Sequence, residues 1–167
     1  MKTRTHRIVI SAMFASLACV ATMIIKIPSP LGGYINLGDS IVLLAGMCLS
    51  PVYAFFAAGI GSFLADIFAG YSLYAPVTFL IKGIMAVVAF LGARSARKKD
   101  NNTLTLISYS ILAEIVMVAG YYVFEGFLYG FAESLVNIAP NAVQGVAGIV
   151  LGVVVYRLFD KNNILGR

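Results

Sequence analysis

The chain has 167 residues, of which 60% are hydrophobic and only 11% are charged, and its formal net charge is +5. Soluble domains are about 45–50% apolar and about 25% charged, so this composition excludes an ordinary water-soluble globule. The positive charge does not indicate a nucleic-acid partner, because the basic residues form short clusters beside long apolar segments. These segments lack the strict alternation of barrel strands. We therefore predict an all-α integral membrane protein, in which residues 1–167 form one domain of six transmembrane helices.

Six apolar segments follow one another with short connections. A helix needs about 20 mostly apolar residues to cross a bilayer core of ~30 Å, so six helices use nearly the whole chain. The basic N-terminus and the apolar run behind it are interpreted as a retained first helix, since no convincing small-residue cleavage site follows. The second helix is short, and Ser50-Pro51 separates it from the third, because proline favours a helix start. The expected helices are 8–25, 35–49, 51–69, 76–93, 104–124 and 140–159.

The basic clusters predict the orientation. Of the 12 Lys and Arg residues, all but Lys26 and Lys82 lie before the first helix, between the fourth and fifth, or at the end of the chain. With an even number of spans, all three clusters lie on one side of the membrane. The positive-inside rule identifies that side as the cytoplasm, so both termini are expected there. The outer connections are then 26–34, 70–75 and 125–139, and segment 126–138 could include a short interfacial helix. They are either lids over a site or plain connectors.

Four ionisable side chains fall within the expected spans, namely Asp66, Lys82, Glu114 and Glu125. Each costs roughly 2.5–3.5 kcal/mol on membrane-insertion scales, so each needs a partner or a polar cavity. One interpretation is a structural pair between Lys82 and either Glu114 or Asp66. The other is that they surround a bound solute.

Amide side chains indicate a site in the outer half of the bundle. Asn137, Asn141, Gln144 and Gly148 are spaced by four, three and four residues, which places them on one helix face if the last helix extends that far. Amides can hydrogen-bond the donors and acceptors of a small polar ring compound. The alternative is hydrogen bonding between helices. Tyrosines also gather on the outer side, where an interfacial aromatic belt is the alternative explanation: Tyr34, Tyr71, Tyr74, Tyr121, Tyr122 and Tyr129.

Small residues and absent motifs narrow the function classes. In the first helix Ser11 and Ala15 are four residues apart, as are Ala12 and Ser16, so another helix could approach closely, within the chain or from another subunit. The sequence has no phosphate-binding P-loop, so any pumping needs a partner ATPase. Its single histidine, His6, lies outside the spans, so we expect no catalytic residues and no metal site. An enzyme is disfavoured.

Four stretches together resemble a known family: 33–46 (GYINLGDSIVLLAG), 59–66 (GIGSFLAD), 74–83 (YAPVTFLIKG) and 141–145 (NAVQG). Their order in a six-span chain is similar to that of the S components, the substrate-binding subunits of energy-coupling-factor (ECF) vitamin transporters. The similarity is greatest to the riboflavin-type branch, which includes hydroxymethylpyrimidine and pyridoxine carriers. It covers most of the chain.

The resemblance implies a subunit of the bacterial plasma membrane that binds a small vitamin or precursor from outside. Import would be driven by a separate transmembrane coupling subunit (the T component) and two cytoplasmic ATPases, which use the ATP, so this chain needs no cofactor of its own. The family docks the coupling subunit through Ala-x-x-x-Ala on the first helix, and here Ser11/Ala15 and Ala12/Ser16 are the two imperfect matches. The expected substrate-binding residues are Tyr34, Asn36, Asp39, Lys82, Glu114, Tyr121, Asn137, Asn141 and Gln144.

Two other functions stay open at this stage. The chain could be a self-contained secondary transporter coupled to protons through Glu114 and Asp66, or a membrane scaffold without a small ligand. The sequence does not identify the solute, because pocket shape decides between small aromatic rings.

Overall fold

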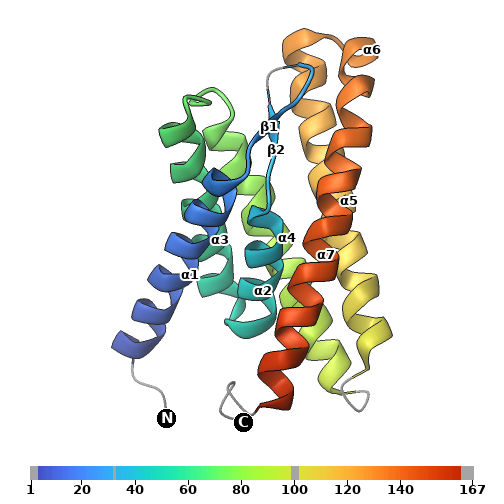
Figure 1. Cartoon of the computed structure of the whole chain (residues 1–167). Helices are drawn as coiled ribbons and strands as arrows, with labels where there is room; N and C mark the ends of the chain where they lie inside the picture. The colour runs from blue at the N-terminus through green and yellow to red at the C-terminus, as the bar shows by residue number, and fades with distance from the viewer. Residues whose placement is uncertain (1–3, 32, 99–101, 163–167) are drawn as a thin grey trace.

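The computed structural model describes residues 4–31, 33–98 and 102–162, which form an upright bundle of helices with one small extended segment (Figure 1). The basic residues Lys2, Lys99 and Arg167 lie outside the described residues. In chain order the elements are α1 (Arg4–Ile24), β1 (Ile27–Pro28), β2 (Tyr34–Ile35), α2 (Gly38–Cys48), α3 (Pro51–Ala69), α4 (Ala75–Arg97), α5 (Thr103–Tyr129), α6 (Phe131–Ser134), the 3-10 turn η1 (Leu135–Asn137) and α7 (Ile138–Lys161).

Five of the described helices, α1, α3, α4, α5 and α7, are long and apolar enough to cross a membrane. The helix α2 is apolar too, but its 11 residues make it only about 16 Å long. Each of the six expected helices therefore has a counterpart, and the prediction of a multi-pass, nearly all-helical protein is confirmed.

Several expected boundaries were wrong. The fifth helix continues to Tyr129 and ends at Gly130, whose φ of 105° lies in the left-handed region that favours glycine. Gly126 does not stop the helix, because its missing side chain leaves room for the ring of Phe131. The fourth helix also extends to Arg97, so the outer connection 125–139 and the inner connection are both shorter than expected. Segment 126–138 does contain a short helix, α6.

The expected second helix also starts three residues late. Tyr34 and Ile35 pair instead with Pro28 and Ile27 in an antiparallel two-stranded ribbon, and Ser29 N–H donates to the Gly33 carbonyl at 2.8 Å to close the turn. The helix then begins at Gly38, whose N–H donates to the Asn36 side-chain oxygen at 2.9 Å. We call residues 27–31 and 33–36 the outer ribbon.

The short helix α2 lies inside the bundle, where it contacts α1, α3, α4 and α7 (Figure 1). Nearly all of its residues are buried. Gly46 permits its close approach to α4, because a Cβ there would collide with the Ala86 backbone. In the same way, Gly61 of α3 packs against the backbone of Ala15 in α1. Small residues at such crossings let helices pack closely in lipid.

The two ends of the bundle differ in charge. The start of α1, the end of α4 and the end of α7 lie at one end, whereas the outer ribbon and α6 lie towards the other (Figure 1). The described basic residues of the three clusters belong to these first three segments, as expected for one face: Arg4, Arg7, Arg94, Arg97, Lys98, Arg157 and Lys161.

Candidate functional site

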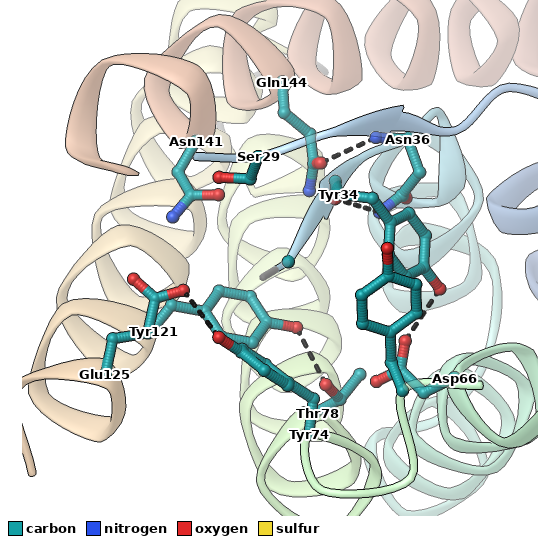
Figure 2. A pocket seen from close by; sticks show the side chains of 12 residues that line it. Ser29, Tyr34, Asn36, Asp66, Tyr74, Thr78, Tyr121, Glu125, Asn141 and Gln144 are labelled. Atoms are coloured by element: carbon teal, nitrogen blue, oxygen red, sulfur yellow. Dashed lines mark hydrogen bonds between the residues drawn. The ribbon is translucent and has the colours of Figure 1, made fainter. Parts of the chain in front are cut away.

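A small cavity lies beneath the outer ribbon, between α3, α4, α5 and α7 (Figure 2). Its free volume is about 30 Å³, which holds a few waters at most. A larger solute would therefore require the ribbon or the lining side chains to move. The lining residues are Ser29, Gly33, Tyr34, Asn36, Asp66, Tyr71, Tyr74, Thr78, Tyr121, Glu125, Asn141 and Gln144.

One wall joins the ribbon to α3. The Tyr34 hydroxyl donates to Asp66 Oδ1 at 2.7 Å, and the Tyr34 and Tyr71 rings lie 4.7 Å apart between centroids. This hydrogen bond ties the outer ribbon to α3.

A second wall is formed by α4 and α5. The hydroxyls of Thr78 and Tyr121 lie 3.1 Å apart and share a hydrogen bond. Thr78 is one helical turn before Lys82, so the two residues share a face of α4. The Lys82 ammonium lies 5.5 Å from the centroid of the Tyr121 ring, within cation–π range.

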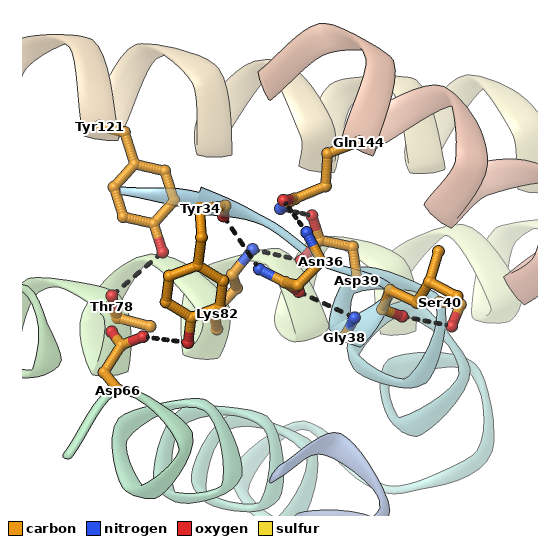
Figure 3. A network of polar contacts seen from close by, with 11 residues as sticks. Tyr34, Asn36, Gly38, Asp39, Ser40, Asp66, Thr78, Lys82, Tyr121 and Gln144 are labelled. Carbon is orange, nitrogen blue, oxygen red and sulfur yellow. Dashed lines mark hydrogen bonds and ion pairs between the residues drawn. The ribbon is translucent and has the colours of Figure 1, made fainter. Parts of the chain in front are cut away.

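A buried polar network adjoins the cavity and shares Asn36 and Gln144 with its lining (Figure 3). The Lys82 ammonium makes an ion pair with Asp39, and both side chains are at most 3% exposed. Gln144 Nε2 donates to the other Asp39 oxygen at 2.6 Å, and Gln144 Oε1 accepts the Asn36 backbone N–H at 2.8 Å. Asp39 lies in the first turn of α2, where the helix dipole favours a negative charge. The network therefore connects α2, α4 and α7 to the outer ribbon.

The partner of Lys82 is neither of those considered from the sequence. Asp39 replaces Glu114 and Asp66 in that role, because the N-terminus of α2 brings Asp39 against the middle of α4. Lys82 and Gln144 meet on one carboxylate, and Asn141 lines the adjacent cavity. Lys82, Asn141 and Gln144 thus belong to one polar region beside a cavity. They do not make three unrelated helix–helix contacts.

A further set of hydrogen bonds closes the outer side. The Ser29 hydroxyl donates to Asn137 Oδ1, and Asn137 Nδ2 donates to Glu125 Oε1 at 2.9 Å. The Tyr74 hydroxyl also donates to Glu125 Oε1, at 3.3 Å. The ribbon is thereby held against both α5 and the start of α7.

Glu114 lies away from this cavity. It lines a separate apolar groove between α5 and α7, together with residues such as Ile115 and Val146. Both of its oxygens are buried without a hydrogen-bond partner within the described part of the chain. Gly145 and Gly148 of α7 leave the space that its side chain occupies.

The structure thus gathers most of the residues singled out from the sequence. Tyr34, Asn36, Tyr121, Asn141 and Gln144 line the cavity, and Asp39, Lys82 and Asn137 contact lining residues or one another. Sequence reasoning omitted several lining residues from the expected site. Two of these residues could have been identified from their positions in the sequence, because Ser29 lies in the turn-rich outer segment and Thr78 lies one helical turn from Lys82. The lining side chains absent from the expected list are Ser29, Asp66, Tyr71, Tyr74, Thr78 and Glu125. Of these, Asp66 and Glu125 had been singled out as ionisable groups within the spans, and Tyr71 and Tyr74 as outer-side tyrosines.

Comparisons with known proteins agree with this geometry. A family model described as "ECF-type riboflavin transporter, S component" matches residues 2–161. The chain belongs to the S-component family of ECF transporters. This match confirms the family that was expected from the sequence. Members of the family are transport subunits that work with a T component and ATPase subunits and bind vitamin substrates.

The relatives of this S component include both curated sequences and a solved structure. A Pyrococcus woesei protein without an assigned function is 37% identical over 134 residues, which cover 80% of this chain and 87% of the relative. The thiamine precursor transporter HmpT of Lactococcus lactis subsp. cremoris is 30% identical over 139 residues, which cover 83% of this chain and 77% of the relative. The S component of a bacterial ECF transporter superposes with a TM-score of 0.75 at 25% identity, covering 99% of this chain and all of the other.

Proposed function

We propose that this S component captures a small water-soluble vitamin or precursor at the outer face of a bacterial plasma membrane. The candidate solutes are hydroxymethylpyrimidine, pyridoxine and riboflavin-like compounds. A T component and two cytoplasmic ATPases deliver the solute, and the ATPases use the ATP. This proposal rests on the polar cavity beneath the outer ribbon, which is lined by tyrosines, amides and carboxylates in an otherwise apolar bundle. The relationship to a thiamine precursor transporter supports the same class of solute.

The proposed orientation places the described basic clusters in the cytoplasm and the ribbon outside. It requires six spans, with α2 and the ribbon together forming the second passage. The helix α2 alone is too short for a bilayer core, but the ribbon continues in the same direction towards the outer end (Figure 1). The cavity then opens towards the side from which an importer must load.

One face of α1 suits the docking of a coupling subunit. Ala12 and Ser16 are exposed, whereas Ser11 and Ala15 are partly buried, and the Ala15 backbone packs against Gly61 of α3. These observations favour the Ala12/Ser16 register for docking over the Ser11/Ala15 register. Large apolar side chains flank the exposed pair along the same stripe: Val9, Met13, Leu17 and Val20.

A binding measurement on the isolated subunit tests the capture function. The purified full-length chain in detergent should bind one of the candidate solutes at micromolar concentration or below in isothermal titration calorimetry. Failure of hydroxymethylpyrimidine, pyridoxine, riboflavin, thiamine, pantothenate and folate to bind would refute it. A loss of binding in Asn141→Ala without a loss of thermal stability would separate capture from a purely structural scaffold role.

The buried, unpartnered carboxyl group of Glu114 favours a second candidate, a self-contained proton-coupled transporter. Reconstitution decides between the two functions. In liposomes under a proton gradient, this chain alone should not accumulate solute, and uptake should require the T component, the ATPases and ATP. Accumulation by the chain alone, abolished by Glu114→Gln, would establish the second function instead.

A further inference from the structure

The apolar groove between α5 and α7 is a second void, and it shares no lining residue with the cavity beneath the outer ribbon. Its free volume is about 440 Å³, within the roughly 300–1,000 Å³ of small-molecule sites. Ile115 and Val146, which line it, are 56% and 62% exposed. Because α5 and α7 are both long and apolar enough to cross a membrane, the groove opens to lipid. We call it the α5–α7 groove. Its described lining residues are Ile111, Glu114, Ile115, Val118, Ala119, Tyr122, Ile138, Ala142, Gly145, Val146 and Ile149.

Glu114 differs from the other described lining residues, which apart from Tyr122 are aliphatic residues or glycine. It lies near the middle of α5 and is 6% exposed, and within residues 4–31, 33–98 and 102–162 neither of its oxygens has a hydrogen-bond partner. Its carboxyl group reaches α7, where Cβ atoms on Gly145 and Gly148 would lie 3.1 and 3.0 Å from its oxygens. The side chain therefore bridges the two helices at the groove.

The interior of the bundle does not supply the missing hydrogen bonds. The Lys82 ammonium is paired with Asp39. Asp39 packs behind Gly148, since its Cβ lies 2.8 Å from the position of a Cβ on that glycine. An ionised Glu114 would therefore place two negative charges beside one cation within the membrane, and the neutral acid costs much less. A neutral acid presents one O–H donor and one carbonyl acceptor.

This pair of hydrogen-bonding groups distinguishes between occupants that the lipid phase can supply. An acyl chain fills apolar space but has no polar atom for the acid. An amine cation would have to carry its charge to mid-depth in the bilayer, which is costly. A hydroxyl group offers one donor and one acceptor and so matches the acid on both counts. An apolar molecule with a single hydroxyl therefore fits both the walls of the groove and Glu114.

We propose that the α5–α7 groove is a second binding site, which takes a small apolar molecule with one hydroxyl group from the bilayer and hydrogen-bonds it to Glu114. The hydroxyl donates to the carbonyl oxygen of the acid and accepts its O–H, while the aliphatic walls contact the apolar body. Since both oxygens are buried beside α7, the side chain rotates outward to make these bonds. This site does not depend on the proposed capture function.

A lipid-soluble carbodiimide tests whether a lipid-phase molecule reaches Glu114 in proteoliposomes that contain the full-length chain. The acid adds across one C=N bond of dicyclohexylcarbodiimide, so that its oxygen bonds to the central carbon and its proton moves to a nitrogen. The acyl group then migrates to nitrogen and gives a stable N-acylurea, with no atom lost. Peptide mass spectrometry should find this adduct on Glu114, whereas a water-soluble carbodiimide should leave Glu114 unmodified. Absence of the dicyclohexyl adduct from Glu114 would overturn the proposal.

Thymol and its methyl ether are matched probes of the hydrogen bond, because both have the same apolar ring and only thymol has a hydroxyl. Both should slow the modification of Glu114, and the thymol concentration that halves its rate should be about tenfold lower than that of the ether. Equal concentrations for the two probes would refute the hydrogen bond to Glu114. No protection by either probe would refute the site.

A pair of neighbouring substitutions on α7 tests the location. Ala142→Phe should fill part of the groove and slow the modification of Glu114 by about tenfold or more, because Ala142 lines the groove and is exposed. Val143→Phe is the matched control, because Val143 is 65% exposed on the same helix and is not among the lining residues. It should leave the rate unchanged. Equal rates in the two variants would show that the reagent does not reach Glu114 through this groove.

Discussion

Replacing Lys82 by methionine should strongly destabilise the protein, because it leaves the Asp39 carboxylate buried without its cation. Asp39 is fully buried and keeps only the Gln144 amide as a partner in the variant. Removing one member of a buried ion pair costs about 3–5 kcal/mol. For a chain of this size each kcal/mol lowers Tm by about 2–4 °C, so the expected decrease is about 6–20 °C.

The double variant Lys82→Met/Asp39→Asn provides the decisive comparison. It removes both charges, and the introduced asparagine can still accept from Gln144 Nε2, so at least about 2 kcal/mol of the loss should be recovered. The chain has no tryptophan, so thermal unfolding in detergent is followed by far-ultraviolet circular dichroism. If the double variant is as unstable as Lys82→Met, or if Lys82→Met is as stable as the parent, the ion pair does not act as argued.

Three other substitutions probe packing, the ribbon and docking. Gly61→Val should force α1 away from α3 and lower stability by about 1–3 kcal/mol, whereas Ala142→Val, on an exposed position of α7, should change Tm little. Gln144→Leu breaks the bonds to the Asn36 N–H and the Asp39 carboxylate and should weaken solute binding about tenfold or more, chiefly through faster dissociation in stopped-flow or filter assays. Ser16→Leu should abolish co-purification with the T component while the isolated subunit keeps its solute affinity; retained co-purification would exclude this docking register.

The sequence predicted elements that depend on local signals. The third helix matches its expected bounds of 51–69, because Pro51 starts it and Gly70, with a φ of 85°, ends it. The start of the second helix was missed, since two-residue pairing of the ribbon across Pro28 leaves no periodic pattern. The extension of α5 to Tyr129 was missed, because room for it depends on the packing of the Phe131 ring against Gly126, which the sequence does not show.

The site was predictable as a region but not as a set of contacts. The spacing of Asn141 and Gln144 correctly placed two amides on one side of α7, where both line the cavity, whereas Asn137 precedes that helix and lies in the 3-10 turn η1. The ion pair between Asp39 and Lys82 was not foreseen, because the two residues are far apart in sequence and only the fold brings them together. In a bundle rich in buried polar groups, composition shows that partners are needed, whereas only the fold shows which they are.

The ion pair between Asp39 and Lys82 also bears on how the chain enters the bilayer during synthesis. Each charge alone penalises insertion of its own segment by roughly 2.5–3.5 kcal/mol, and neutralisation becomes available only once α4 has left the ribosome. The short α2, with its aspartate, therefore gains from remaining at the translocon until the later lysine arrives. We therefore expect α2 and α4 to insert cooperatively, although the helix α3 lies between them in the chain.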